Sequence, residues 1–202
     1  MVTQDSTEKF RGMKQRGEKI TALTAYDYPT AETPAQAVET AKRFVDVGAQ
    51  AVKLEGGVSH VEKIEAITQA GIPFMAHIGM LPQHVREEGG YKVKGRTHSE
   101  AEALLSDARA VEKAGAFSVV LEIVVADIAK QITHAVDIPT IGIGSGEHCD
   151  GQILVTHDLI GLFPWFTPKF VSPQARVADE IRNAARAFIE RTRGSGTAPS
   201  GG

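Results

Sequence analysis

The chain alternates between short apolar runs and longer segments in which apolar residues recur at helical spacing. The apolar runs predict strands, which lie at residues 20–25, 50–54, 72–78, 117–123, 139–143 and 168–171. The segments between them predict helices at residues 35–47, 59–70, 99–115, 126–136 and 174–192. Repeated strand–helix units joined by short loops indicate a parallel sheet covered by helices.

Two α/β folds fit this pattern. A closed (β/α)8 TIM barrel needs eight strands and typically about 250 residues, whereas this chain has 202 residues and six predicted strands. An open six-stranded parallel α/β sheet needs no further strand. The pattern leaves both folds open. In either case we expect a single domain over residues 1–192, followed by a disordered tail at residues 193–202.

Composition narrows the class of partner. The 22 Lys and Arg residues against 25 Asp and Glu give a net charge of −3, so we expect neither a nucleic acid nor a membrane as partner. No apolar run approaches the roughly 20 residues of a membrane-spanning helix. Cys149 is the one cysteine, so no internal disulfide can form, and we expect a cytoplasmic protein.

Polar residues gather where the predicted parallel strands end, which is where both folds place their sites. In AVKLEGG, Lys53 and Glu55 are two residues apart, so a strand directs both side chains to the same face. An ordinary ion pair is the simpler interpretation of such a pair, although the two following glycines let a ligand approach closely.

Glu122 interrupts the apolar run VVLEIVV. A buried carboxylate is costly unless another group pairs with it. A general base for a reaction near neutral pH and an internal salt bridge both fit this position, and we favour the base. His77 lies at the end of the third predicted strand, but a single histidine does not indicate a function by itself. The run GIGSG at residues 142–146 could bind an anionic group through its backbone N–H groups.

Taken in order, several motifs resemble one family. They are TAYDY, AVKLEGG, AHIGMLPQ, GGYKVKGRT, EKAGAFSVVLE, IPTIGIGSGEHCDGQILV, HDLIGLFP and PKFV, and they extend from about residue 10 to about residue 192. The chain resembles the ketopantoate (3-methyl-2-oxobutanoate) hydroxymethyltransferases. The resemblance implies a TIM barrel of the phosphoenolpyruvate/pyruvate type that is short of two βα units.

The missing units would lie near Ala31 and Glu32, between TAYDY and AVKLEGG. In similar proteins, one of these strands ends in a Gly-Asp-Ser motif and the other in an Asp-x-Pro-Phe motif. Their aspartates contact the metal, and the Gly-Asp-Ser turn holds the substrate carboxylate. The residues alone leave two explanations open, a true deletion and a segment absent only from the printed sequence.

The resemblance also implies a reaction. A hydroxymethyl group would pass from 5,10-methylenetetrahydrofolate to 3-methyl-2-oxobutanoate, giving 2-dehydropantoate in pantothenate biosynthesis, by Mg²⁺-assisted enolate formation. Glu122 would be the catalytic base, Lys53 would bind the substrate and Glu55 would contact the metal. Tyr26 and His77 would line the pocket.

Three further expectations complete this interpretation. The polar, glycine-containing residues 84–98 could form a lid over the folate. The amphipathic C-terminal helix could pack on another subunit, and the resemblance suggests a homo-oligomer, often a decamer. The alternatives are another Mg²⁺-dependent 2-oxo acid lyase or aldolase barrel, and a truncated, non-catalytic remnant that binds a ligand or oligomerises.

Overall fold

The computed structural model describes residues 12, 15–16, 20–24, 33–163 and 165–194 of the 202. The chain divides into two compact units, Met1–Ile153 and Leu154–Gly202. We describe each unit by itself, and the expectation of one domain over residues 1–192 stays a prediction. Within the described residues, no helix is long and apolar enough to cross a membrane.

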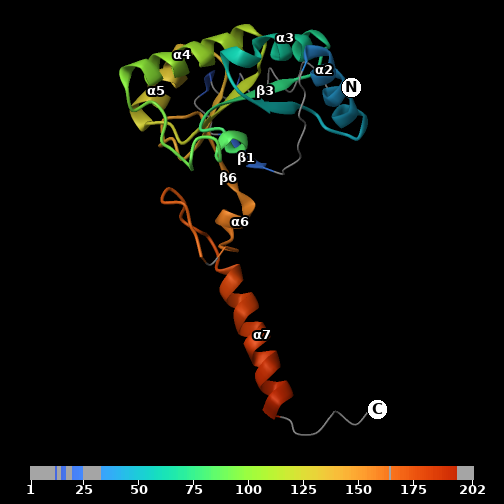
Figure 1. Ribbon diagram of the computed structural model, residues 1–202, viewed down its shortest axis with the longest axis vertical. Coiled ribbons are helices and arrows are strands. Elements are labelled where there is room, and N and C mark those ends of the chain that lie inside the picture. The colour runs from blue at the N-terminus through green and yellow to red at the C-terminus, as the bar shows by residue number, and fades with distance from the viewer. Residues whose placement is uncertain (1–11, 13–14, 17–19, 25–32, 164, 195–202) are drawn as a thin grey trace. The chain divides into compact units, whose positions relative to one another are not determined.

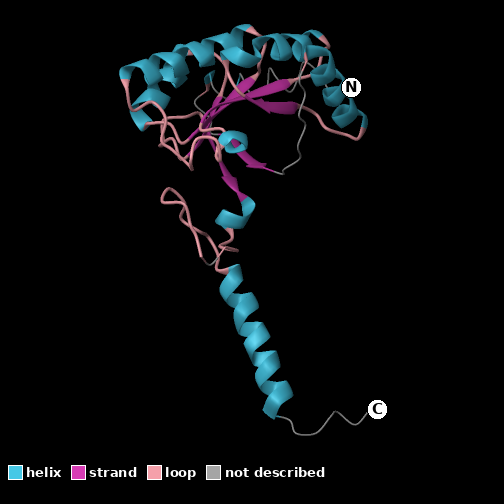
Figure 2. Ribbon diagram, in the orientation of Figure 1, coloured by secondary structure: helices cyan, strands magenta, loops and turns pink. Residues whose placement is uncertain are grey.

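The first unit is built from alternating strands and helices (Figure 1). Its strands are β1 (Ile20–Thr24), β2 (Val52–Glu55), β3 (Phe74–Gly79), β4 (Ser118–Glu122), β5 (Thr140–Ile143) and β6 (Gly151–Val155, which continues past the boundary between the units). Its α-helices are α2 (Pro34–Asp46), α3 (Val61–Gln69), α4 (His98–Lys113) and α5 (Ala126–Ala135). The 3₁₀ turns η1 (Val58–His60) and η2 (Pro82–His84) follow β2 and β3. Figure 2 shows the helices packed along the sheet.

The sheet has the strand order β1-β6-β5-β4-β3-β2, and successive pairs from β2 to β6 are parallel. In a closed barrel every strand pairs with its neighbours in the chain, and the first strand pairs with the last. This order keeps all of those pairings except β1 with β2. Among the described strands, β1 and β2 are therefore the one pair of chain neighbours that do not pair, and the sequence places the missing units between them. The structure confirms the prediction of a parallel α/β sheet, and this strand order is consistent both with a barrel short of two βα units and with an open six-stranded sheet.

Local sequence signals explain where the helices begin. Thr33 caps α2 through a reciprocal capping box with Gln36, and Pro34 occupies the first helical position, where its missing N–H costs nothing. Thr97 caps α4 by accepting a hydrogen bond from the Glu100 N–H. The helices predicted from the sequence at 35–47, 59–70, 99–115 and 126–136 are confirmed, with shifts of a few residues at their ends.

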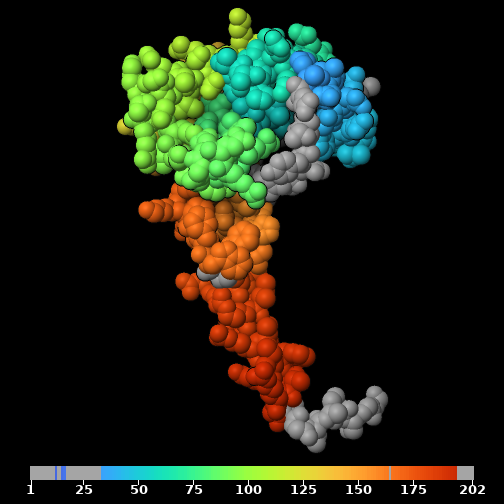
Figure 3. Space-filling view, viewed as in Figure 1, coloured from blue at the N-terminus to red at the C-terminus, as the bar shows by residue number. Residues whose placement is uncertain are grey.

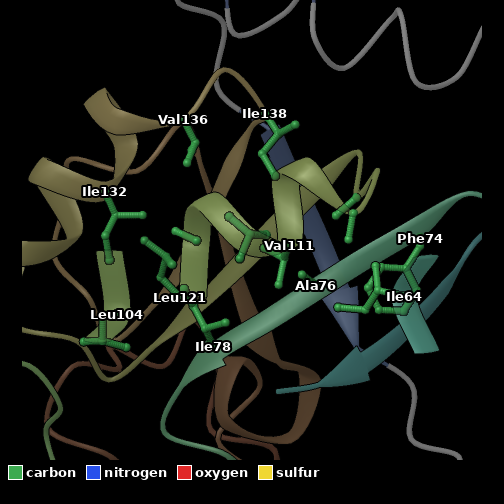
Figure 4. Close-up of a cluster of buried hydrophobic side chains, with 14 of the residues drawn as sticks. Ile64, Phe74, Ala76, Ile78, Leu104, Val111, Leu121, Ile132, Val136 and Ile138 are labelled. Carbon is green, nitrogen blue, oxygen red and sulfur yellow. The ribbon is translucent and has the colours of Figure 1, made fainter. Parts of the chain in front are cut away.

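The core of the first unit lies where the helices meet the sheet (Figure 4). Phe74, Ala76 and Ile78 alternate along β3 and are almost fully buried. They pack in one cluster with Ile64 of α3 and Val111 of α4. This alternation places the residues between them, including His77, on the other face of β3.

One predicted strand is wrong. Residues 168–171 form a turn, in which Val171 N–H donates to the Pro168 carbonyl. The sixth strand is instead β6, which pairs with β5 through Ile141–Gly151 and Gly142–Gln152. Its first two residues, Gly151 and Gln152, are poor strand signals, and they follow a glycine-rich segment that indicates a loop.

The second unit contains a short helix, α6 (Thr156–Leu159), and the long helix α7 (Val177–Gly194). The segment between them folds back on α6, because Gln174 and Val177 donate backbone hydrogen bonds to Leu159 and Ile160. His157 stacks on Phe163 with ring centroids 5.3 Å apart. Helix α7 confirms the predicted C-terminal helix with a start three residues later, and residues 195–202 of the expected tail lie outside the described residues.

Candidate functional site

Strands β2, β3 and β4 bring four predicted site residues to one edge of the sheet. The register pairs Glu55 with His77 and Gly79 with Glu122. Lys53 lies two residues before Glu55 on β2, so both side chains lie on the same face of the sheet. Because the strands are parallel, their carboxyl ends meet at this edge.

His77 is at the centre of the group and is only 5% exposed. Its Nδ1 lies 3.1 Å from Lys53 Nζ and 3.9 Å from Glu55 Oε1. An ammonium group can only donate, so Nδ1 accepts this hydrogen bond and the ring proton is assigned to Nε2.

The other ring nitrogen faces Glu122. His77 Nε2 lies 3.1 Å from Glu122 Oε2, which is ion-pair range. The contact lacks the geometry of a hydrogen bond, so this buried nitrogen has no hydrogen-bond partner among the described residues. An unsatisfied buried polar atom is costly. A ligand beside this pair would meet a donor, His77 Nε2–H, next to an acceptor, the Glu122 carboxylate.

Lys53 is the cation of the group. Burial lowers its pKa, while the nearby carboxylates of Glu55 and Glu122 act in the opposite direction. About a third of the side chain, 35%, still reaches solvent. A positive charge that is partly desolvated and close to two carboxylates can stabilise a negative charge developing on a ligand.

Glu55 is held on two sides. Its Oε1 lies 3.9 Å from both Lys53 Nζ and His77 Nδ1, and its Oε2 accepts a hydrogen bond of 3.2 Å from the Gln83 N–H. The structure therefore shows Glu55 beside Lys53, as predicted, although the 3.9 Å separation is longer than a direct hydrogen bond.

Close backbone contacts fix the end of β4 that carries Glu122. The Glu122 carbonyl accepts a hydrogen bond of 2.8 Å from the Met80 N–H. Gly79 has a φ of +98°, and a Cβ there would lie 2.4 Å from the Glu122 carbonyl oxygen. Only glycine fits this position without strain.

The residue after Glu122 is in a rare conformation. Ile123 has a φ of +50°, which a β-branched residue seldom adopts. Its N–H donates to the Ile143 carbonyl, and its carbonyl accepts from the Lys94 N–H at 2.9 Å. Strained backbone of this kind persists only where neighbouring contacts enforce it, and it is common at functional sites.

Ser145, in the predicted anion-binding run at residues 142–146, joins β4 to β5. Its hydroxyl donates to the Leu121 carbonyl at 2.7 Å and accepts from the Val124 N–H at 3.0 Å. Sequence reasoning missed this contact, as it missed the role of Ile123, because neither residue type marks a site by itself. Anion binding by the run stays a prediction.

The predicted lid at residues 84–98 follows η2 and leads into α4, and its residues are green in Figure 3. Lys94 and Glu88 form an ion pair within the segment. The backbone of Lys94 also bonds to both Ile123 and Val125. The segment is thus fixed to the chain directly after Glu122, while its closure over a folate stays a prediction.

Two other predicted features cannot be placed at this site. Tyr26 lies outside the described residues, as do the neighbouring residues 25–32. Among the residues that are described, no three His, Cys, Asp or Glu side chains converge as a metal-binding cluster. The described part of the site is a cluster of one cation, two carboxylates and a buried imidazole, made by Lys53, Glu55, His77 and Glu122.

Comparison with known proteins identifies the family. The family model of ketopantoate hydroxymethyltransferase matches residues 31–199. The 3-methyl-2-oxobutanoate hydroxymethyltransferase of Mesorhizobium japonicum is 54% identical over 163 residues, which are 80% of this chain and 57% of that protein. The enzyme of the same name from Cenarchaeum symbiosum is 45% identical over 190 residues, 93% of this chain and 72% of that protein.

Alignment with a third relative shows a difference in length between that protein and this chain. The 3-methyl-2-oxobutanoate hydroxymethyltransferase of Syntrophus aciditrophicus is 38% identical over 256 residues, covering 96% of this chain and 94% of that protein. This alignment is longer than the 202 residues of the chain, so it contains gaps opposite residues of the relative.

Solved structures support the fold. Two proteins from Burkholderia cenocepacia, one assigned as a phosphonomutase and one as a lyase or mutase, match with TM-scores of 0.50 and 0.51, each at 15% identity. The matches cover 92% and 95% of this chain, and 78% and 69% of those chains. Together, the family match and the identities to these relatives show that the chain belongs to the ketopantoate hydroxymethyltransferase family.

Proposed function

We propose that this chain transfers a hydroxymethyl group from 5,10-methylenetetrahydrofolate to C3 of 3-methyl-2-oxobutanoate, giving 2-dehydropantoate. The observation that supports this most strongly is the group around His77, in which a base and a cation lie on opposite sides of a buried imidazole. The membership of the family and the names of the relatives supply the substrate.

In the proposed reaction, Glu122 removes the proton from C3, and the electron pair of the broken C–H bond moves toward the keto oxygen. Lys53 stabilises the resulting enolate by its positive charge. The His77 ring holds a proton on Nε2, close to Glu122. C3 of the enolate then bonds to the methylene carbon of the folate as the first of that carbon's two C–N bonds breaks. Water supplies the hydroxyl group as the second C–N bond breaks, and tetrahydrofolate leaves with both nitrogens protonated, one by the proton that Glu122 removed and one by a proton from the water.

We also propose Mg²⁺ as the cofactor. Mg²⁺ is commonly held by one or two carboxylates together with oxygens of the substrate and water. Glu55, a carboxylate at the carboxyl end of β2 that is 10% exposed, fits the role of such a ligand beside a chelating 2-oxo acid. When bound, the ion would act as a Lewis acid on the keto oxygen.

The test is incubation of the purified chain with 3-methyl-2-oxobutanoate, 5,10-methylenetetrahydrofolate and Mg²⁺, with NMR detection of 2-dehydropantoate. Formation of this product supports the proposal. Proton exchange at C3 without folate turnover would favour a different 2-oxo acid lyase or aldolase. Neither reaction would favour a non-catalytic remnant.

The lowered pKa of Lys53 leads us to expect that the rate of C3 exchange depends on pH in the alkaline range. Because burial lowers the pKa, Lys53 loses its proton at a pH below the ordinary 10.5. We therefore expect the rate of C3 exchange to fall as the pH rises through the lowered pKa of Lys53, because the ammonium is lost. In Lys53→Arg the guanidinium keeps its proton, so this loss should disappear, although the rate at pH 7 falls because the two cations differ in shape. Profiles of kcat/KM against pH measure this, and identical alkaline limbs in both proteins would contradict it.

We propose a homo-oligomer, which the family resemblance suggests is a decamer. The large apolar side chains of α7 support an association, since Ile181, Phe188 and Ile189 are exposed. We expect sedimentation to report a species several times heavier than the 21.6 kDa chain. A monomer at micromolar concentration would count against this proposal.

A further inference from the structure

Asp107 is a charged residue of the outer helix α4 that reaches the loop directly after Glu55. Its Oδ1 accepts a hydrogen bond of 2.8 Å from the Val58 N–H. Burial raises the pKa of this carboxyl group, and the bond from Val58 acts in the opposite direction. Among the described residues, the Val58 N–H is the group that favours the charged form of this partly buried carboxylate.

The two glycines after Glu55 leave space for these contacts. A Cβ on Gly57 would lie 2.1 Å from Asp107 Oδ1, and a Cβ on Gly56 would lie 2.4 Å from His60 Nδ1. Gly57 is also the N-cap of η1 and has no side chain that could cap the turn. Asp107 supplies the missing cap from a different element of the fold.

The capped turn is joined to the site by a short path. The Gly56 N–H donates to the His77 carbonyl at 2.8 Å, and the preceding residue is Glu55. The carboxylate of Glu55 lies 3.9 Å from both His77 Nδ1 and Lys53 Nζ. A shift of the turn would therefore change the distances within the site.

We propose that Asp107 is a positioning residue: by capping the Val58 N–H from α4, it holds Glu55 at its place beside Lys53 and His77. The inference rests on the proposed function, in which Glu55 is a Mg²⁺ ligand beside the substrate. It assigns a role in the site to a helix residue that contacts neither the substrate nor the reacting atoms.

Two pairs of variants separate positioning from general stabilisation. Asp107→Asn keeps an oxygen acceptor of the same size, whereas Asp107→Leu removes it. Val58→Pro removes the donor instead, and because the proline Cδ takes the place of the amide hydrogen, the Asp107 carboxylate must also move away from the turn. Glu112→Leu is the control, because Glu112 lies on the same helix and accepts hydrogen bonds from the backbone N–H groups of Asp137 and Ile138. These two residues precede the amino end of β5, whereas the site lies at the carboxyl ends of the strands.

The first readout is the ring ¹⁵N and ¹H NMR signals of His77, assigned with a His77→Gln variant. Asp107→Leu and Val58→Pro should both shift these signals, while Asp107→Asn and Glu112→Leu should leave them in place. Unchanged signals in both Asp107→Leu and Val58→Pro would overturn the proposal. An equal shift in Glu112→Leu would also overturn it. If Asp107→Leu does not fold, Val58→Pro decides the question alone.

The second readout is C3 proton exchange. Asp107→Leu should lower kcat about tenfold with KM within about twofold, as expected for a small displacement of a site group. Asp107→Asn should stay within about twofold of the unsubstituted chain in both constants. Absence of exchange in the unsubstituted chain would contradict the proposed function, whereas the His77 signals would still decide the positioning role.

Discussion

Replacing Glu122 with glutamine is expected to slow exchange of the C3 proton of 3-methyl-2-oxobutanoate about 10³-fold, within the range for loss of a general base. Glutamine has nearly the same shape as glutamate and fills the space of the Glu122 side chain. An amide, however, cannot accept the C3 proton. The buried His77 Nε2–H would still face an oxygen or an amide group at this position. We therefore expect KM to change little while kcat falls.

The matched control for this substitution is Glu102→Gln. Glu102 is an exposed residue of α4 that pairs with His98 and lies outside the site. The Glu102→Gln variant should exchange the C3 proton at the same rate as the unsubstituted chain. If Glu122→Gln exchanged the C3 proton as fast as Glu102→Gln, Glu122 would not be the base.

Gly79→Ala is expected to lower the free energy of unfolding by about 2–4 kcal/mol, because backbone strain and overpacking act together. The φ of +98° disfavours any residue with a Cβ, and the added atom would lie 2.4 Å from the Glu122 carbonyl oxygen. Relief of this clash requires β3 and β4 to separate at the end that carries Glu122. The substitution should therefore reduce C3 exchange as well as stability.

Gly48→Ala provides the comparison, since Gly48 has a similar φ of +106° but no atom within 4 Å of a Cβ. We expect Gly48→Ala to lower the free energy of unfolding by about 1 kcal/mol, because only the backbone strain acts there. Urea unfolding with an unchanged m-value measures both. If both variants lost the same free energy of unfolding, the close contact at Gly79 would make no contribution to the loss.

The sequence predicted the parts of the fold that depend on local pattern. The apolar run at residues 72–78 predicted the strand, whereas its two faces, with Phe74, Ala76 and Ile78 in the core and His77 opposite, came from the structure. The spacing of Lys53 and Glu55 predicted a shared face, and both lie beside His77. The interval proposed for the missing units lies between β1 and β2, the one pair of chain neighbours among the described strands that do not pair.

The contacts that sequence reasoning missed are long-range. Asp107 reaches Val58 across 49 positions of sequence, and Ser145 reaches Leu121 across 24. An aspartate within an amphipathic helix indicates only a solvated face, and a serine between glycines indicates only a loop. Strand β6 was missed for a related reason, because its pairing with β5 is specified by the neighbouring strand rather than by its own glycine and glutamine.

The proposed function depends most directly on whether the unsubstituted chain removes the C3 proton. The measurement is ¹H NMR of 3-methyl-2-oxobutanoate in deuterium oxide, with the chain and Mg²⁺ present and with no folate. We predict that the C3 signal disappears faster than in the same solution without protein, at a rate proportional to the concentration of the chain. A C3 signal that decays at the same rate with and without the chain would contradict the assignment of Glu122 as the base and the proposed function with it.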